Sequence, residues 1–347
     1  MRQISGLGAA RAALLAIALG LFLTACSKDA TYRDEAYVFG TRVELTIADL
    51  PQDRAHAASA AVLREFDRIH RAYHAWEPSE LSSLNEAIAR GESFEASAEL
   101  AGLLASTRAL ARTGDELLNP AIGGLIALWG FQSDHFEARL PPQDEIDRLV
   151  AKAPTLDALT ISGRRIESSN RAVKIDLGGV AKGWALDRAA QILHAQGVHD
   201  ALINIGGNIL ALGSKNGTPW RVGIQHPRRA GAIATLNLGD GEAIGSSGDY
   251  QRFFDLDGRR YCHLIDPRSG APAQGTASLT VLVTARRDAG LLSDVASKPA
   301  FIDSAHWRER LAAYGIEYGL RVGTDGRIEV TPAMARRLEF ASDARPE

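Results

Sequence analysis

Residues 174–187 predict a short strand, a glycine turn and a helix in immediate succession. Asp176 ends the apolar strand of residues 173–175, and Gly178 and Gly179 let the backbone turn sharply and approach a ligand without a Cβ in the way. Apolar residues then recur at three- and four-residue spacing, which is typical of a helix. Free backbone N–H groups at such a helix N-terminus favour an anion, although a βα turn that only packs has the same pattern.

Helical patterns dominate the first half of the chain, and strand patterns dominate the second. Apolar spacing predicts helices over residues 54–73, 79–85, 98–112, 143–152, 288–298 and 305–314. Strands are predicted over residues 37–47, 158–161, 165–167, 201–205, 220–225, 234–238, 242–246, 250–255, 260–265, 278–283, 317–322 and 327–330. This segregation favours an α+β fold over an alternating α/β fold, and no long Pro-, Ser- or Gly-rich linker divides the chain.

The composition excludes several classes of protein. The 347 residues are 46% hydrophobic and 23% charged, which is ordinary for a globular protein. The formal net charge of −3 provides no broad basic surface, so no nucleic-acid partner is expected. Cys26 and Cys262 are too few for a disulfide framework.

The N-terminal residues have the pattern of a bacterial lipoprotein signal. Arg2 and Arg11 precede an apolar run, residues 12–23, that is too short to span a bilayer comfortably. The run leads into Leu-Thr-Ala-Cys, which resembles a lipobox, so we expect cleavage before Cys26 and lipidation of its thiol. An ordinary secretory peptide with a chance cysteine is the alternative.

This signal predicts the organisation and the location of the protein. We expect a signal peptide over residues 1–25, a lipid-anchored tether over residues 26–34 and one domain over residues 35–347. The domain would be held to a membrane of the bacterial cell envelope and face the periplasm or the exterior.

Four polar clusters lie far apart in the sequence, at residues 176–187, 245–250, 263–270 and 293–298. Hydroxyls and backbone amides in glycine loops suit phosphate oxygens, and a carboxylate suits a hard cation such as Mg²⁺. A histidine in the third cluster can move a proton near neutral pH. Taken alone, each feature also has a structural reading, as an Asp-Pro turn, a carboxylate in the first turn of a helix or a packed histidine.

Together these clusters resemble the motifs of the ApbE family, the FAD:protein FMN transferases. The resemblance extends from residue 39 to about residue 302, and its most specific parts are residues 176–185, 205–208, 247–250, 263–270 and 293–294. It implies a single ApbE-like (T-fold-like) α+β domain that binds FAD in a cleft, with helices mainly in the first half and mostly antiparallel strands in the second. Family members are typically exported and often lipid-anchored, which agrees with the lipobox.

The resemblance also implies a reaction. FAD is cleaved at its pyrophosphate, AMP leaves, and FMN is joined by a phosphoester to a Thr or Ser hydroxyl of a partner protein. Two other functions stay open on the sequence. One is a metal-dependent FAD diphosphatase, in which water replaces the protein acceptor. The other is a lipid-anchored flavin-binding protein with little turnover.

The dianionic pyrophosphate requires charge neutralisation, which Mg²⁺ supplies in the family. The family's metal ligands correspond to the backbone carbonyl of Ala181 and to the side chains of Asp294, Ser297 and Lys298. Lys298 stands where the family usually has Thr, and a protonated ammonium cannot ligate a cation. Lys298 therefore either points away or occupies the metal position and neutralises phosphate itself.

For the flavin end, the resemblance implies contacts at Phe39, Trp76, Leu117, Leu118, Asn119, Gly178, Trp184 and the backbone of Ile265. The two tryptophans offer rings on which the isoalloxazine or the adenine can stack, and plain core packing is their alternative role. Asn119 and Ala121 depart from the Asp and Thr that the family usually has.

Three residues are the expected catalytic groups. Lys182 would neutralise pyrophosphate charge, and a solvated lysine in the first turn of a helix is the alternative. His263 would take the proton of the acceptor hydroxyl. Asp266 would orient His263 or simply cap the turn that follows it.

Overall fold

The computed structural model describes residues 31–133 and 137–342, together with residues 344 and 346. The predicted signal peptide and the lipidation site at Cys26 lie outside these described residues. Strand β1 begins at Tyr32, within the segment that the sequence assigns to the tether. Within the described part of the chain, no helix is both long enough and apolar enough to cross a membrane.

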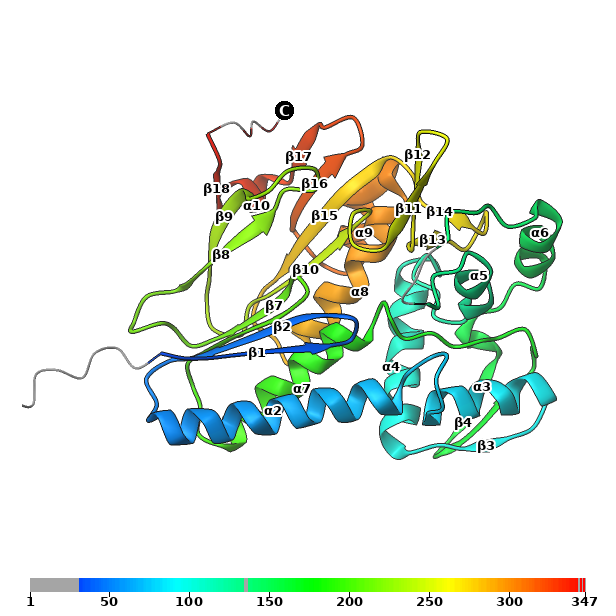
Figure 1. Cartoon of the computed structure of the whole chain (residues 1–347), viewed down its shortest axis with the longest axis horizontal. Helices are drawn as coiled ribbons and strands as arrows, with labels where there is room; N and C mark the ends of the chain where they lie inside the picture. The colour runs from blue at the N-terminus through cyan, green and yellow to red at the C-terminus, as the bar shows by residue number, and fades with distance from the viewer. Residues whose placement is uncertain (1–30, 134–136, 343, 345, 347) are drawn as a thin grey trace, which may run out of the picture.

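An eight-stranded antiparallel sheet is the central element of the fold (Figure 1). Segments far apart in the sequence are neighbours in it, because β2 pairs with β6 and β10 pairs with β15. In spatial order its strands are β1 (Tyr32–Val38), β2 (Thr41–Ile47), β6 (Ala201–Ile205), β7 (Asn208–Leu212), β10 (Ala243–Gly248), β15 (Thr276–Val283), β16 (Tyr318–Gly323) and β17 (Ile328–Val330).

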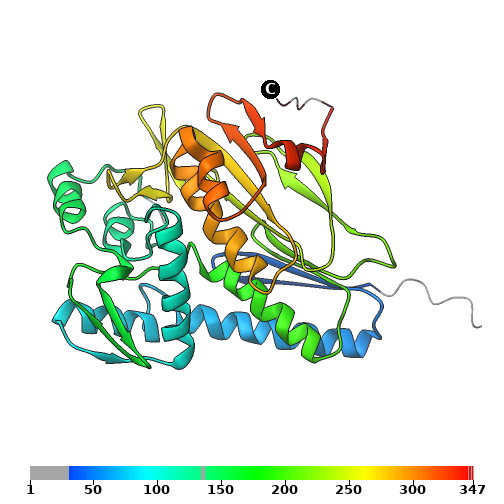
Figure 2. The ribbon, with the colours of Figure 1, turned by 180° about the vertical axis from the view of Figure 1, so that it is seen from behind.

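Helices cover one face of this sheet, and from behind α7 and α8 are seen in front of it (Figure 2). They are α2 (Gln52–Ala72), α7 (Ala181–Ala195), α8 (Ala289–Ile302) and α9 (Trp307–Ala313). Helix α8 packs against α7, β10 and β15, and all 14 of its residues are buried. Its polar residues are therefore enclosed, so each needs a partner within the protein.

The opposite face of the sheet is covered by a three-stranded antiparallel sheet in the order β18-β9-β8. Its strands are β8 (Trp220–Gln225), β9 (Ala232–Leu238) and β18 (Leu338–Phe340), with the short helix α10 (Pro332–Ala335) before the last. The strand β8 alternates buried and exposed residues, so its buried face closes a second apolar core.

The remaining elements form a part of the molecule beside the helical layer (Figure 1). A three-stranded sheet in the order β3-β5-β4 accompanies α3 and α4, and a third apolar cluster joins α5 and α6 to two short hairpins. These elements are α3 (Glu80–Arg90), β3 (Phe94–Glu95), α4 (Ala98–Thr113), α5 (Gly123–Leu128), α6 (Gln143–Ala151), η1 (Leu156–Ala158), β4 (Leu159–Ser162), β5 (Arg165–Ser168), β11 (Phe253–Leu256), β12 (Arg259–Cys262), β13 (Ile265–Asp266) and β14 (Ala271–Pro272). The 3₁₀ turn η2 (Ser304–His306) precedes α9.

The predicted α+β class is confirmed, and the predicted helices agree with the structure to within a few residues except at the ends of α3 and α8, which continue to Arg90 and Ile302. Three predicted strands differ. Residues 260–265 are not one strand, because β12 ends at Cys262 and β13 begins at Ile265. Residues 37–47 form a hairpin rather than one strand, because Phe39 and Gly40 both have positive φ, +57° and +67°, and make a two-residue turn. Residues 173–175 form no named strand, and only Lys174 makes a bridge, to Ile122.

Candidate active site

A cleft of about 970 Å³ opens where the helical layer meets the part of the molecule that carries α3–α6. Most of the predicted site residues line it, although they come from distant segments. They are Phe39, Trp76, Leu117, Leu118, Asn119, Gly178, Ala181, Lys182, His263, Ile265 and Lys298. Four predicted residues lie outside the lining, namely Trp184, Asp266, Asp294 and Ser297.

The glycine turn before α7 has its N–H groups largely occupied within the protein. The Gly178 N–H donates to Asp176 Oδ1 over 2.9 Å, and those of Val180 and Ala181 donate to the Leu177 carbonyl over 2.9 and 2.8 Å. A negative charge lies at this helix start, on the side chain of Asp294 in α8. The positive end of the helix dipole favours a negative charge there. Side chains, rather than these backbone groups, therefore supply most of the positive character of the cleft.

The side chain of Asp294 is fully buried. Its Oδ2 accepts a hydrogen bond from the Gly183 N–H over 2.8 Å. Its Oδ1 accepts from the Lys298 ammonium, which also donates to the Asp294 carbonyl over 2.7 Å. Gly183 is required at the crossing of α7 and α8, because a Cβ there would lie 2.4 Å from the carbonyl oxygen of Gly290. The carboxylate thus has a partner on each oxygen.

Ser297 belongs to the same buried cluster. Its Oγ donates to the Asp294 carbonyl over 2.7 Å and lies 2.8 Å from the Oγ of Ser247, in strand β10. The start of α8 is held in place by Asp187 of α7, whose carboxylate accepts from the N–H groups of Gly290 and Leu291 over 2.8 and 2.9 Å. Burial raises the pKa of Asp187 to about 7.

The charges of Asp294 and Lys298, which form a buried ion pair, are linked. Burial disfavours ionisation of Asp294, but the positive charges of Lys298 and Lys182 outweigh burial and hold its pKa below the ordinary value. Burial lowers the pKa of Lys298, and the carboxylate opposes that shift. Removing either charge of such a buried pair would leave the other without compensation, which is strongly destabilising.

The family's Mg²⁺ does not fit the donors found here. Asp294 is the one carboxylate among the four corresponding positions, and each of its oxygens already accepts a hydrogen bond, one of them from an ammonium. Lys298 brings a positive charge to the place where a hydroxyl ligand is expected, which repels a cation. The described residues contain no group of three or more His, Cys, Asp or Glu side chains that could hold a metal. No step is therefore assigned to a metal.

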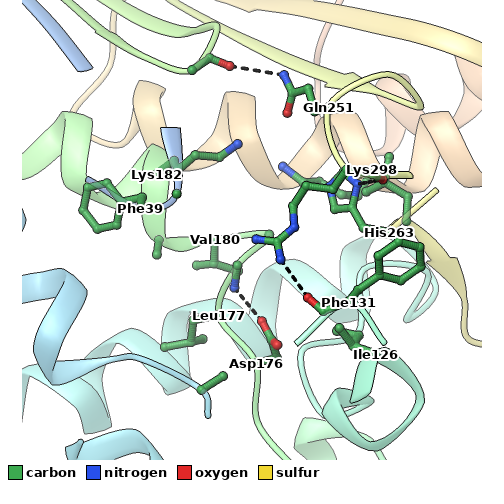
Figure 3. A pocket seen from close by; sticks show the side chains of 18 of the residues that line it. Phe39, Ile126, Phe131, Asp176, Leu177, Val180, Lys182, Gln251, His263 and Lys298 are labelled. Carbon is green, nitrogen blue, oxygen red and sulfur yellow. Dashed lines mark hydrogen bonds between the residues drawn. The ribbon is translucent and has the colours of Figure 1, made fainter. Parts of the chain in front are cut away.

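His263 enters the cleft from the segment between β12 and β13, and Figure 3 shows it in the same region as Lys182 and Lys298. Its Nδ1 lies 3.2 Å from the carbonyl oxygen of Arg252. A carbonyl only accepts, so Nδ1 carries the proton and Nε2 keeps its lone pair. Burial, followed by the charges of Lys182 and Arg252, lowers the pKa of His263 to about 3. The ring is therefore neutral, and its free Nε2 can accept a hydrogen bond from a hydroxyl.

Asp266 does not contact His263 among the interactions of the described residues. Its carboxylate accepts from the backbone N–H of Arg268 over 2.9 Å and from the guanidinium of the same residue over 2.7 Å. The Gly270 N–H closes the turn on the Asp266 carbonyl over 2.8 Å. Of the two roles open on the sequence, this geometry favours the cap of the turn.

The aromatic residues divide into two groups. Phe39 and Trp76 line the cleft, and Trp76 is 39% exposed with the Arg252 guanidinium 5.9 Å from its ring centre. Trp184 is outside the lining and packs with the ring of Tyr73, their centroids 5.7 Å apart. Stacking on a flavin is thus open to Phe39 and Trp76, whereas Trp184 has the packing role.

The loop that carries Asn119 is braced from within. The amide of Asn119 donates to the Pro154 carbonyl over 2.8 Å and accepts from the Ala121 N–H over 2.9 Å. The side chain of Asn119 therefore stabilises the turn through both its amide N–H and its carbonyl oxygen. The neighbouring Leu117 and Leu118 are buried and form part of the apolar wall.

Sequence reasoning missed Arg252, which organises one side of the cleft. Its carbonyl holds His263, and its guanidinium donates to the carbonyls of Phe131 and Ser133, each over 2.9 Å. Its position two residues after the motif of residues 247–250 was the available signal. The partner of Asp249 in that motif, Arg228, had no signal, although it binds the carboxylate over 2.5 and 2.6 Å.

Comparison with known proteins identifies the family of this chain. The sequence profile of the ApbE family matches residues 39–318. A FAD:protein FMN transferase of Rhodobacter capsulatus is 40% identical over 341 residues, which are 98% of this chain and 64% of that protein. One of Vibrio cholerae is 30% identical over 280 residues, 78% of this chain and 82% of that protein.

The fold agrees with that relationship. The crystal structure of the ApbE protein of Thermotoga maritima superposes with a TM-score of 0.81 at 29% identity, over 89% of this chain and 99% of that one. The chain spans just under two thirds, 64%, of the length of the Rhodobacter relative. Sequence, fold and the arrangement of the motifs around one cleft lead to the same conclusion, that this chain belongs to the ApbE family.

Proposed function

We propose that the protein is a FAD:protein FMN transferase. The observation that carries this proposal is the meeting of Lys182, Lys298 and a neutral His263 in one cleft. The cleft, at about 970 Å³, is at the upper end of the size of sites for small molecules and cofactors, as a dinucleotide requires. Family membership and the names of the relatives support the same substrate and reaction class.

The proposed step is a displacement at phosphorus. The hydroxyl oxygen of an acceptor Thr or Ser bonds to the phosphorus of the FMN half, and the bond from that phosphorus to the bridging oxygen breaks. The bridging oxygen leaves with AMP. The hydroxyl proton passes to Nε2 of His263, which then releases it to the solvent or to AMP. Lys182 and Lys298 offset the negative charge of the pyrophosphate.

Two exposed aromatic residues lie among the residues that line the cleft. Tyr37, on β1, is 77% exposed, and Trp76 is 39% exposed. Both lie on the lining, so they border the opening as well as the interior. Exposed aromatic residues at the opening suit contact with a partner protein, which brings its Thr or Ser to the phosphate.

The proposal is tested with the full chain in detergent, FAD and a protein that carries a flavinylation-type Thr. Flavin fluorescence on the denatured acceptor together with released AMP supports transfer. AMP without labelled acceptor supports the diphosphatase, in which water takes the place of the hydroxyl. Bound FAD with neither product supports the flavin-binding protein and contradicts both enzymatic functions.

We also propose that Cys26 anchors the protein to a membrane of the bacterial cell envelope. The support is the sequence of residues 23–26 after a short apolar run. Cys26→Ser should move the protein from the membrane fraction to the soluble fraction and abolish labelling by a radioactive fatty acid. Membrane association and labelling that survive the substitution would contradict the anchor.

A further inference from the structure

We propose that Lys298 is a built-in cation that takes the place of a divalent metal beside the pyrophosphate. The inference rests on the proposed function, because the pyrophosphate is that of FAD. With the ammonium of Lys298 in this position, this member of the ApbE family binds FAD without Mg²⁺. The chain itself supplies the positive charge, through an ammonium whose position is fixed by a buried carboxylate.

The first argument is the state of the carboxylate. Asp294 directs Oδ2 to the N–H of Gly183 in α7 and Oδ1 to the ammonium of Lys298. A metal on the Oδ1 side of this carboxylate would meet the ammonium of Lys298, which repels it, and would have to displace that ammonium or the N–H of Gly183 to lie close to the oxygens. Displacing Lys298 would leave a buried ammonium without its counter-charge, and displacing the N–H would leave a buried donor without an acceptor.

The second argument is the position of the ammonium. The side chain of Lys298 is only 8% exposed, yet the residue lines the cleft. Its Cε lies 3.5 Å from the place that a Cβ on Gly179 would occupy, so it rests against the glycine turn. Two of its three N–H groups have acceptors among the described residues, the carboxylate and the carbonyl of Asp294. The third is available to a phosphate oxygen.

The third argument is the total charge. A divalent cation would bring two positive charges to a dianionic pyrophosphate. Lys298 brings one from α8 and Lys182 brings another from α7, and both side chains reach into the same cleft (Figure 3). The lysine pair therefore matches the charge that a metal would supply. The charge of Lys298 is fixed in place by Asp294 before FAD binds, so little reorganisation is needed there.

Metal binding is the direct test, and it does not depend on turnover. The full chain is titrated with Mn²⁺, and free Mn²⁺ is read by electron paramagnetic resonance. Wild type should bind no more Mn²⁺ than Asp294→Ala. Lys298→Thr should gain one equivalent and a higher Tm in the presence of Mn²⁺, because it exchanges the ammonium for a hydroxyl ligand. The exposed Lys152→Thr is the matched control and should behave as wild type.

FAD affinity, read by quenching of flavin fluorescence, is the second measurement. Wild type should bind FAD equally, within about twofold, in EDTA and in millimolar Mg²⁺. Lys298→Thr should lose at least about tenfold in EDTA and recover in Mg²⁺. An equivalent of Mn²⁺ on wild type that Asp294→Ala loses would overturn the inference, as would wild-type FAD affinity that collapses in EDTA.

These outcomes are separable from failure of the proposed function. If no variant releases AMP or labels an acceptor under any condition, the transferase is contradicted. The Mn²⁺ titration and the FAD affinities still decide whether Lys298 acts as the cation. If Lys298→Thr does not fold, the comparison of wild type in EDTA and Mg²⁺ remains sufficient to overturn or support the inference.

Discussion

Asp294 and Lys298 form an ion pair one turn apart along α8, enclosed at the cleft. The i, i+4 spacing places the ammonium directly beside the carboxylate, and the surrounding helix is buried on all sides. The pair links the two helices that border the cleft, because the carboxylate also holds the N–H of Gly183 in α7. The charge of the site and the packing of the fold therefore depend on the same residues.

A double-mutant cycle should detect this coupling. Asp294→Ala leaves a buried ammonium unpaired and should lower the free energy of unfolding by about 3 kcal/mol. Asp294→Ala combined with Lys298→Met should recover part of that loss, because no buried charge remains, whereas the N–H of Gly183 still lacks its acceptor. Urea denaturation measures both. Asp144→Ala removes an exposed i, i+4 pair with Arg148 and should change the free energy of unfolding by less than about 0.5 kcal/mol. A double variant as unstable as the single one would contradict the coupling.

Loss of the proton acceptor should separate binding from chemistry. His263→Ala should keep FAD affinity within about threefold and reduce transfer by about 10²- to 10⁴-fold, because the ring accepts the hydroxyl proton only in the reaction. Flavin fluorescence measures binding, and the labelled acceptor measures transfer. His199→Ala is the control, since His199 is an exposed histidine. A variant that loses FAD binding together with transfer would make His263 a structural residue.

The stability of the protein should depend on His263 in acid. Its pKa is about 3 in the folded protein against an ordinary value of 6.5, so the unfolded chain binds one more proton between these values. Stability due to the neutral ring is complete above the unfolded pKa and is lost as the pH falls through it toward about 3.

Between about pH 7 and about pH 5, wild type should lose about 2 kcal/mol more of its free energy of unfolding than His263→Gln, which does not titrate. Urea denaturation at the two pH values gives this difference. Equal losses for the two proteins would show that the ring is already protonated or freely solvated in the fold.

The two tryptophans should respond differently to truncation. Trp76→Ala removes an exposed ring from the cleft and should weaken FAD binding by about tenfold with little change in Tm. Trp184→Ala removes a ring that packs with Tyr73 and should lower the free energy of unfolding by about 3 kcal/mol, with FAD affinity maintained under stabilising conditions. Fluorescence titration and denaturation distinguish the two. The reverse pattern would place the flavin against Trp184.

Much of the fold could be predicted because its signals are local. Ser79 caps the start of α3, which is a signal within a few residues of the helix. The helical spacing of its buried residues is the local signal for α2. The turn of β1 into β2 could not be predicted in this way. Phe39 has φ of +57°, a conformation that a bulky residue rarely adopts, so the sequence there continues to look like a strand. Such a strained residue on the lining of a cleft is typical of a functional site.

The site was predictable where a motif combined turn chemistry with a polar group. Lys182, His263 and Lys298 lie in such clusters, the resemblance to the ApbE family assigns them to one site, and all three line one cleft. Contacts between distant segments were not predictable. The hydrogen bond from Gly183 to Asp294 joins residues that are 111 positions apart. The carbonyl that orients His263 belongs to Arg252, which lies in the connection between β10 and β11. Backbone groups make these contacts, and a backbone group has no signature in the sequence.

Intact-mass spectrometry of the acceptor protein tests the proposed transfer most directly. After incubation of the full chain with FAD, the acceptor should gain the mass of FMN less one water, with an equal amount of AMP in solution. Replacing the acceptor Thr by Ala should abolish the gain, and His263→Ala should slow it. An acceptor of unchanged mass, with AMP and FMN both free in solution, would contradict the transferase and establish hydrolysis of FAD instead.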